Sequence, residues 1–303
     1  MMRSLYSGVS GLRVHQTRMD VIGANLANVN TVGFKSSRVT FRDVLYQTIA
    51  NPGTPSADAP TRGGTNPSQI GLGVNVASID VLMTRAGPML TDKPTDVYID
   101  GEGFFLVTDA SENEYYTRVG DFRFDGLGRL VDGNGNFVMG VLGDRETVDE
   151  IPEEGTAIGD LVVLDLLEAA GGPEEWARLS QISIGTDGII SAYDPLDDGS
   201  RIVLGQIAIC KFVNNEGLSQ EGNSYWRPTR NTGDPDEPDF NPRVYAPGIG
   251  GVGRTIANRL EMSNVELSKE FTDMIVTQRG FQANSRIITV SDEMIQELVN
   301  LKR

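Results

Sequence analysis

The chain of 303 residues is 39% hydrophobic and 22% charged, an ordinary composition for a soluble protein with one or two hydrophobic cores. Its formal net charge of −16 is unevenly spread, because residues 43–253 carry thirteen Lys and Arg against thirty-four Asp and Glu. So acidic a middle repels phosphate backbones, which argues against a nucleic-acid-binding protein.

Signals for a membrane span or a disulfide are missing from the sequence. No run approaches 18 apolar residues, and residues 1–20 lack the continuous apolar stretch of a secretory signal. We therefore expect no membrane insertion and, if the protein leaves the cell, export without a cleaved signal peptide. Cys210 is the single cysteine and lies in the apolar run IAICKF, so we expect a small buried side chain and no intramolecular disulfide.

The first predicted element is an amphipathic helix from about residue 3 to 28. Its apolar residues recur at spacings of three and four, with Gln16 filling one gap in the register. At 1.5 Å per residue such a helix is roughly 39 Å long. The stripe consists of Leu5, Val9, Leu12, Met19, Ile22 and Leu26.

The stretch NLANVNTVGFK ends this helix abruptly. Asn25, Asn28 and Asn30 follow one another closely, and a short amide side chain competes for backbone hydrogen bonds at helix ends and turns. Gly33 and Phe34 then follow, a glycine and an aromatic residue. The pattern indicates a firm helix stop, after which the chain turns away.

The middle of the chain reads as β-structure. After the strand-like VTFRDVLYQTI comes a stretch rich in Pro, Gly, Ser and Thr, which is typical of an extended connection. Short alternating runs then dominate, namely DVYIDGEGFFLVTD, EYYTRVGDFRFDGLGRLVDGNGNFVMGVL, SQISIGTDGIISAYD and RIVLGQIAICKFV. Glycine-bearing turns separate them about every ten residues, as in a β-barrel or sandwich.

A second long helix is predicted to run to the end of the chain. Ser263 and Glu266 are spaced as a capping box, and the apolar periodicity follows at once. Gln278, Ser285 and Asp292 fill gaps in its register. Its stripe consists of Leu267, Phe271, Met274, Phe281, Ile288, Ile295 and Leu298.

The two helical stripes are narrow, about two residues in seven, which favours a two-helix coiled-coil seam over the broad face of a globular helix. We expect the ends of the chain to pair antiparallel, with Asn28 near Leu267. Gln16 then falls opposite Gln278 or Arg279. Two separate helices packed on one core are the alternative.

The predicted fold class is therefore α+β, with the N- and C-terminal helices paired as a coiled coil and a central all-β domain of barrel or sandwich type. Residues 1–30 with 258–303 form the helical domain, residues 31–75 an extended connecting segment, and residues 76–257 the β-rich domain. A small acidic insertion near 144–176, with one short helix, is expected on its surface.

Motifs for catalysis are weak. His15 is the only histidine and lies between stripe positions, so a solvated or packing role is expected, and neither a histidine triad nor a zinc site with a second histidine is possible. Gly248, Gly250 and Gly253 satisfy GxGxxG, but no βαβ unit surrounds them. We predict a glycine-rich hinge there.

A calcium loop is also a poor match. Asp132, Asn134 and Asn136 begin like one, yet Phe137 stands where the sharp-turn glycine belongs and Gly143 where the bidentate glutamate belongs. A tight β-turn is the simpler interpretation. We therefore predict no enzyme activity, no catalytic or metal residue and no cofactor, and an architecture suited to assembly.

The residues of both ends resemble a known family. LYSGVSGLRVHQTRMDVIGANLANVNTVGFK resembles the N-terminal signature of the flagellar axial proteins, the rod, hook and hook-associated subunits. DGEGFFLV and YYTRVGDFRFDGLGRLV resemble the central β motif of the hook and distal-rod subfamily, and MSNVELSKEFTDMIVTQRGFQANSRIITVSDEMIQEL is similar to the terminal helix of hook subunits. Together these stretches cover well over half of the chain, in the family's order.

The resemblance implies a structural subunit that polymerises into the tubular flagellar hook, the flexible joint that transmits torque from motor to filament. QRGFQANSRIIT favours the hook, whereas the short body and the Pro/Gly stretch at 51–69, which is similar to the rod's extra segment, favour the alternative, a distal rod subunit of the basal body. Implied partners are further copies of the chain, adjoining axial proteins (distal rod, hook cap, hook–filament junction) and the type III export apparatus. The implied location is the bacterial flagellum, at the hook or basal body.

In this family the terminal helices pair into an inner domain that lines a tube, so the resemblance identifies NLANVNTVGFK as the exit from that helix. Asn25 and Asn28 would satisfy backbone groups of the last turn, Gly33 would permit a backbone conformation closed to other residues, and Phe34 would anchor the departing strand. A plain helix stop without contacts to neighbouring subunits is the alternative. A secreted β module whose helical ends dock on another protein is the competing functional class, and a dinucleotide enzyme is the least supported one.

Overall fold

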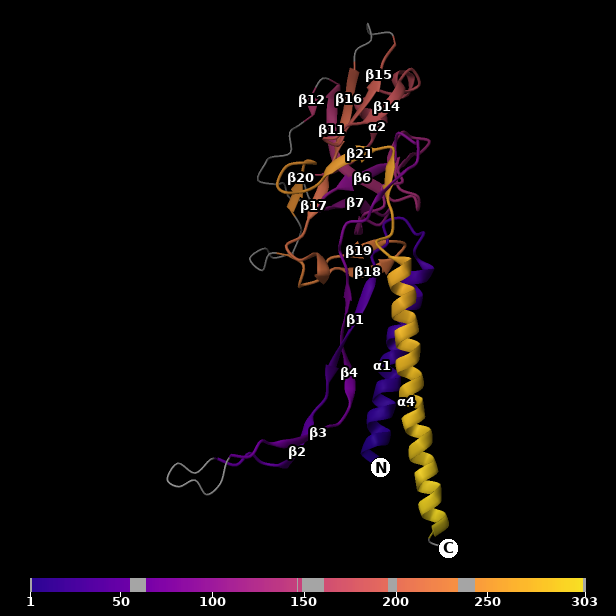
Figure 1. Ribbon diagram of the computed structural model, residues 1–303. Helices are drawn as coiled ribbons and strands as arrows, with labels where there is room; N and C mark the ends of the chain where they lie inside the picture. The colour runs from indigo at the N-terminus through magenta and orange to yellow at the C-terminus, as the bar shows by residue number, and fades with distance from the viewer. Residues whose placement is uncertain are drawn as a thin grey trace. The chain divides into compact units, whose positions relative to one another are not determined.

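The structure, a computed structural model, describes residues 2–54, 64–145, 147–148, 161–195, 201–233 and 243–301 (Figure 1). The chain folds into two compact units. The helical unit holds residues 1–29, 36–82 and 265–303, and the β body holds residues 30–35 and 83–264. None of the helices in the described ranges is long and apolar enough to cross a membrane.

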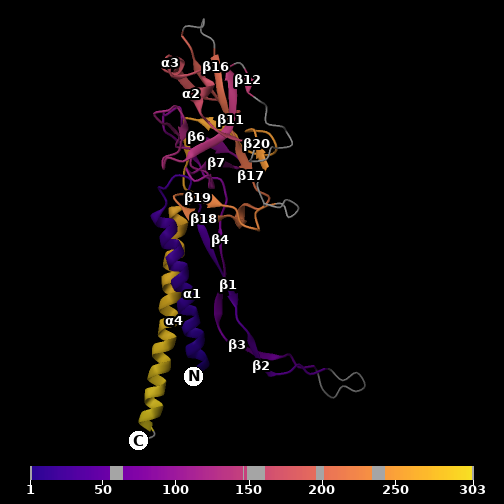
Figure 2. The same ribbon diagram turned by 180° about the vertical axis from the view of Figure 1, so that it is seen from behind.

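The helical unit consists of two long helices and a ribbon of strands. Its elements are α1 (Met2–Ala27), β1 (Ser37–Asp43), β2 (Tyr46–Ala50), β3 (Ser68–Gly71), β4 (Val74–Val81) and α4 (Leu267–Leu301). The helices α1 and α4 lie side by side and run antiparallel in both views (Figures 1 and 2). β1 pairs antiparallel with β4, and β2 with β3, so the predicted connecting segment contains a two-stranded ribbon. Part of the Pro/Gly stretch, residues 55–63, lies outside the described residues.

The bounds of α1 agree with its apolar periodicity, but α4 begins later than predicted. The capping-box spacing places the helix start next to Ser263, whereas the first helical residue is Leu267. The backbone N–H of Asn264 donates to the carbonyl oxygen of Phe34 at 3.4 Å, so this residue is still in an extended, paired segment. The Glu266 carbonyl is the one that accepts the first helical N–H groups.

The β body is built on antiparallel strand pairs. Its elements are β5 (Pro88–Leu90), β6 (Val97–Asp100), β7 (Phe104–Thr108), β8 (Glu114–Thr117), β9 (Arg123–Phe124), β10 (Leu130–Val131), β11 (Phe137–Arg145), β12 (Thr147–Val148), β13 (Val162–Val163), α2 (Leu166–Ala169), α3 (Pro173–Trp176), β14 (Ser180–Ile184), β15 (Ile189–Tyr193), β16 (Arg201–Ile207), β17 (Ile209–Lys211), the 3₁₀ turn η2 (Asn215–Gly217), β18 (Ser219–Gly222), β19 (Tyr225–Arg227), β20 (Arg243–Tyr245), β21 (Arg254–Ala257) and β22 (Arg259–Glu261). The main sheet runs in the order β14-β15-β16-β11-β7-β8-β19-β18. All four alternating runs picked out in the sequence form strands of this body.

The hydrophobic core of the body lies on this sheet and under the two short helices. Phe105, on β7, and Leu204, on β16, are completely buried in it. Leu164 and Leu166 are also completely buried there, so the prediction of a surface insertion at 144–176 is wrong for its described second half. Burial of these apolar side chains outweighs the acidic character of the segment. Residues 149–160 lie outside the described residues.

Candidate assembly interface

The helices α1 and α4 contact each other in a regular antiparallel register. Gly11 faces Asn284, and His15 faces Gly280. Nearer the end of α1, Asn25 donates to the carboxylate of Glu270 at 3.2 Å. In each of these facing pairs, the two residue numbers add up to about 295. The predicted register, Asn28 near Leu267, has the same sum.

Glycines let the two helices approach closely at two positions, which the apolar pattern does not detect. A Cβ added at Gly11 would lie 2.5 Å from Nδ2 of Asn284, and one added at Gly280 would lie 2.6 Å from Cε1 of His15. Such close packing maximises dispersion contacts and leaves no room for a larger side chain. Glycines three apart, as Gly8 and Gly11 are, were the signal in the sequence that could have revealed this seam.

His15 is a packing histidine. Its ring lies against Gly280 and meets the ring of Phe41 edge-on, with centroids 5.9 Å apart. Burial lowers the pKa of His15, and the neighbouring Arg18 guanidinium lowers it further. The imidazole is therefore neutral over more of the acidic range than a free histidine.

A salt bridge and a buried amide flank the seam. Arg18 contacts Asp273 at 2.8 Å, and both side chains remain about one-third exposed. Burial raises the pKa of Glu270, and the hydrogen bond from Asn25 opposes that shift. The polar contacts fix the register, whereas the small residues set the distance between the helices.

The stripe residues predicted as assembly positions are only partly covered by the helix pairing. Ile22 is buried. The half-buried ones are Leu5, Leu12, Met19, Leu26, Met274, Phe281, Ile288 and Ile295. The exposed ones are Val9, Leu267, Phe271 and Leu298.

At the end of α1, two asparagines hold the chain as it leaves the helix. The Asn25 side chain exchanges two hydrogen bonds with the backbone of Ser37, at 2.8 and 2.9 Å, and so ties β1 to the helix. Asn28 donates to the Ala24 carbonyl at 2.9 Å, which satisfies a last-turn acceptor. Asn25 thus bonds to the departing strand instead of to the helix end.

The remaining exit residues belong to the β body. Gly33 has φ of +68°, a left-handed conformation that favours glycine, and its N–H donates to the Glu261 carbonyl at 2.8 Å. Phe34 is half-buried, and Asn30 is exposed.

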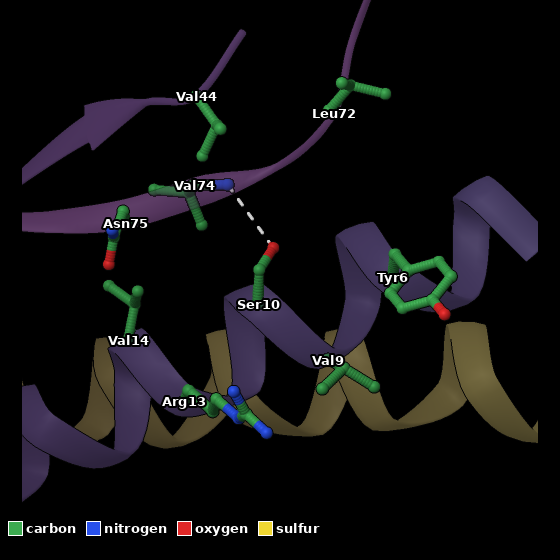
Figure 3. Close-up of a pocket in the computed structure, with 9 residues that line it drawn as sticks. All are labelled: Tyr6, Val9, Ser10, Arg13, Val14, Val44, Leu72, Val74 and Asn75. Carbon is green, nitrogen blue, oxygen red and sulfur yellow. Dashed lines mark hydrogen bonds between the residues drawn. The ribbon is translucent and has the colours of Figure 1, made fainter.

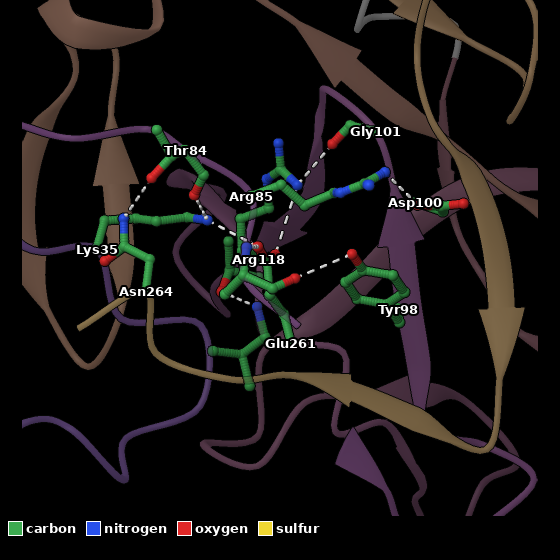
Figure 4. Close-up of polar contacts among 12 residues, drawn as sticks. Lys35, Thr84, Arg85, Tyr98, Asp100, Gly101, Arg118, Glu261 and Asn264 are labelled. Atoms are coloured by element: carbon green, nitrogen blue, oxygen red, sulfur yellow. Dashed lines mark hydrogen bonds and ion pairs between the residues drawn. The ribbon is translucent and has the colours of Figure 1, made fainter. Parts of the chain in front are cut away.

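Directly after Phe34 lies a buried cluster of charges that no local sequence pattern predicted. Lys35 and Glu261 are each 1% exposed, and their side chains form an ion pair at 2.7 Å (Figure 4). Arg118 approaches the other carboxylate oxygen at 3.4 Å and donates to the Gly101 carbonyl at 2.9 Å. The Glu261 carboxylate also accepts from the Ala86 N–H at 3.1 Å. We call Lys35, Arg118 and Glu261 the charge clasp.

Each charge in the clasp is held by a partner. Lys35 gives a second hydrogen bond to the Thr84 carbonyl at 2.9 Å, and the Arg118 guanidinium lies over the Phe104 ring. Burial lowers the pKa of Lys35, while the ion pair with Glu261 opposes the shift. A buried carboxylate shared by two cations joins the first and last segments of the body.

The helical unit exposes many large apolar side chains. On α4 these are Leu267, Phe271, Ile275, Val276, Ile287, Val290, Met294, Leu298, Val299 and Leu301. On and beside the ribbon they are Phe41, Val44, Leu45, Tyr46, Ile49, Ile70, Leu72 and Ile79. An exposed apolar surface of this extent is typical of a region that is covered by another protein.

The GxGxxG motif, Cys210 and the Asp132 motif lie in turns and strands of the β body. The GxGxxG glycines lie in the turn between β20 and β21, where a Cβ at Gly250 would lie within the Tyr245 ring. The hinge itself stays a prediction. Cys210 is fully buried on β17, as predicted, and burial raises the pKa of its thiol.

The false calcium loop is a turn between β10 and β11. Asp132 accepts from the backbone N–H groups of Asn134 and Asn136 at 2.9 Å each. Its other carboxylate oxygen accepts from the Tyr225 hydroxyl, which in turn accepts from both asparagine side chains. These oxygens are engaged within the protein, as the β-turn prediction requires. Among the residues that the structure describes, no cluster of three metal-ligating side chains is found.

Three family models match successive parts of the chain. Residues 5–35 match the flagella basal body rod protein, residues 98–192 the D1 domain of the flagellar hook protein FlgE/F/G, and residues 256–301 the C-terminal region of the flagellar basal body rod FlgEFG protein. They fall on α1 and its exit, on the β body, and on α4 with β22.

Full-length relatives include both rod and hook proteins. The chain is 44% identical over 303 residues to the flagellar basal-body rod protein FlgG of Bacillus subtilis, covering all of both chains. It is 34% identical over 304 residues to the FlgG of Borreliella burgdorferi, again with both chains fully covered. The flagellar hook protein FlgE of the same spirochaete is 30% identical over an alignment of 452 residues that covers both chains.

Proposed function

We propose that this chain, which belongs to the family of flagellar rod and hook subunits, is the distal rod subunit, a structural part of the rigid drive shaft of the basal body. The observation that carries the proposal is that this chain and a rod protein align over their full lengths without a difference in length. The Bacillus rod relative aligns over 303 residues, the full length of this chain. The alignment with the hook relative spans 452 positions, whereas this chain has 303 residues. The difference, 149 positions, has no counterpart in this chain.

The hook, which the pattern QRGFQANSRIIT favours, is therefore the less well supported of the two. A joint that bends needs neighbours that slide, whereas a drive shaft needs dense contacts between subunits. The ribbon of β1 to β4 adds an exposed apolar surface beside the helices, and packing of such surfaces gives an interior of low compressibility. In the sequence, the Pro/Gly stretch that is similar to the rod's extra segment begins directly after β2.

In the proposed polymer, α1 and α4 pack as a coiled coil in the inner layer of a tube. The predicted helical domain, residues 1–30 with 258–303, supplies that layer, residues 31–75 connect, and the predicted β-rich domain, residues 76–257, forms the outer layer. The partners are further copies of the chain and adjoining axial proteins, reached after export through the flagellar apparatus. The relatives are structural flagellar proteins, which supports a subunit without enzyme activity.

The helical unit also supports a delay of assembly until after export. A pair of helices with a seam this thin, and with its outer apolar faces uncovered, is marginal in water. We expect the helices to be partly unfolded in the free subunit and to fold between neighbours. Removal of residues 264–303 is then expected to abolish polymerisation and to leave a soluble β body, whereas polymers formed without α4 would contradict this mechanism.

The placement is tested by immunogold labelling of isolated flagellar basal structures with an antibody against the acidic β body. Label confined to the rod, or exposed only when the surrounding rings are removed, is the expected result. Label along the curved external segment would overturn the rod proposal in favour of the hook.

A further inference from the structure

A pocket of about 410 Å³ opens between α1 and the ribbon (Figure 3). Six of its nine lining residues are apolar, and Ser10, Arg13 and Asn75 are the polar ones. Ser10 fixes its geometry by accepting a hydrogen bond from the Val74 N–H at 3.3 Å. Gly73 lets the ribbon approach this closely, because a Cβ there would lie 2.4 Å from the Ser10 hydroxyl. The apolar lining residues are Tyr6, Val9, Val14, Val44, Leu72 and Val74.

Side chains at the mouth of the pocket face solvent. Tyr6 is 69% exposed, and Val9, Val44 and Leu72 are each about two-fifths exposed. Arg13 is the charged residue of the lining and is exposed as well. The pocket is thus an uncovered apolar socket with one cation at its rim.

The same unit carries an uncovered apolar helix end. The register of the helix pair places Met2, the first residue of α1, beside residue 293, so α4 continues past α1 (Figures 1 and 2). In this overhang, residues 294–301, Met294 is 43% exposed, Leu298 is 52% exposed and Leu301 is 83% exposed. They follow one another at spacings of four and three, so they form one stripe.

Pocket and overhang are complementary in chemistry. Both expose apolar side chains. The exposed carboxylates Glu293 and Glu297 flank the stripe on the overhang, and the cation Arg13 lies at the rim of the pocket. Opposite charges at the rim of an apolar contact steer and orient association. The two surfaces are different patches of one chain, so a contact between them is heterologous and generates a ring or an open helical polymer.

We propose that the overhang of α4 inserts into the α1–ribbon pocket of a second copy of this chain, with Leu298 entering the pocket and Glu297 meeting Arg13 at its rim. This deepens the proposed function and rests on its self-polymerising part. The pocket is centred near residue 10 of α1, beside residue 285 of α4, so it lies about 13 residues from Leu298. At 1.5 Å per residue, copies with parallel helices would be offset by roughly 20 Å along the helix axis.

Paired cysteines test the contact directly. Cys210 is fully buried and stays in place. Polymers of the full-length chain carrying Leu72→Cys together with Leu298→Cys are grown in ammonium sulfate, which strengthens apolar burial, and are then mildly oxidised. A ladder of disulfide-linked multimers on a non-reducing denaturing gel is expected. Either single variant is expected to run as a monomer, and a mixture of the two single variants as a dimer.

A matched control uses Val213→Cys, a site 81% exposed on the β body, together with Leu298→Cys. This pair is expected to give no ladder. If polymers of the Leu72→Cys, Leu298→Cys variant yield no more disulfide-linked multimers than the control, the proposed insertion is wrong. The proposed function is not affected by that result. Failure of the unmodified chain to polymerise overturns the self-assembly in the proposed function and this inference with it.

Charge exchange at the rim gives a second measurement. Arg13→Glu and Glu297→Arg are each expected to raise the critical concentration for polymerisation roughly 2- to 5-fold, and the double variant is expected to restore it. If the two increases in critical concentration simply add in the double variant, Arg13 and Glu297 do not pair.

Discussion

The two units of this protein place their apolar and charged side chains in opposite ways. In the β body, Phe105, Leu164 and Leu204 are completely buried, and even three charges are enclosed. In the helical unit, glycine, histidine and asparagine pack tightly between the two helices, while many large aliphatic and aromatic side chains are exposed. The body is complete as a folded domain, whereas the helical unit has the surface of a domain that neighbours complete.

The largest expected effect comes from opening the charge clasp. Glu261→Gln leaves Lys35 and Arg118 buried without a counter-charge, and breaking a buried ion pair in this way costs about 3–5 kcal/mol. Urea unfolding of the body followed by tryptophan fluorescence checks the result, because Trp226 is 2% exposed in that unit.

The control for this variant is an exposed ion pair of the same body. Arg85 contacts Asp100, and both side chains are about half exposed. Arg85→Ala is therefore expected to change the free energy of unfolding by less than about 1 kcal/mol. If both variants unfold at the same urea concentration, the clasp does not stabilise the body.

A smaller effect is expected from crowding the helix seam. Gly11→Ala places a methyl group against Asn284 and is expected to destabilise the helix pair by about 1–3 kcal/mol. Gly23→Ala on the same helix meets no atom within 4 Å and is expected to stabilise it by about 0.5–1 kcal/mol. Thermal melting followed by circular dichroism at 222 nm measures both variants. Equal melting curves would mean that the seam is not closely packed.

Acid is expected to loosen the helical unit through His15. Its pKa in the folded protein lies below the ordinary 6.5, so below pH 6.5 the unfolded chain binds a proton that the folded helix pair does not. Stability of the helix pair should therefore fall as the pH drops through 6.5 and level off below the folded pKa. His15→Gln is expected to flatten this dependence, as measured by helix melting between pH 7.5 and 5. If the pH dependence of helix stability is unchanged in His15→Gln, groups other than His15 cause it.

The smallest effect is expected for the ion pair beside the seam. Arg18 and Asp273 keep 27% and 35% of their side-chain surface exposed, so water screens their attraction. A double-mutant cycle with alanine is expected to give a coupling of about 0.2–1 kcal/mol. A value several times larger would mean that this pair, and not the small residues, holds the helices together.

Periodicity predicted the elements but not the contacts that join them. The bounds of α1 and the strands of the alternating runs follow from local patterns, in which each residue's neighbours carry the signal. The charge clasp joins residues from distant segments, and a lone Lys35 or Glu261 has no local pattern to reveal it. Leu164 and Leu166 show the same limit, since their acidic surroundings in the sequence hide their place in the core.

The predicted assembly positions stay a prediction for a related reason. A narrow apolar stripe marks a surface that will be covered, but not whether the partner is α1, the ribbon or a second chain. Phe271 and Leu298 carry that signal and remain exposed in the single chain. Gly11 and Gly280 lie in tight contact with the facing helix and lack the apolar side chain that a periodicity search counts.

The charge clasp also delays the completion of folding during synthesis. Lys35 and Glu261 are separated by 226 residues, so their pairing closes one of the longest loops that this chain can make. A ribosome adds about 5–20 residues per second, so roughly 10–45 s pass between the appearance of the lysine and that of its counter-ion. During that time the body lacks its last strand and its central carboxylate, so it cannot finish folding before Glu261 has been synthesised.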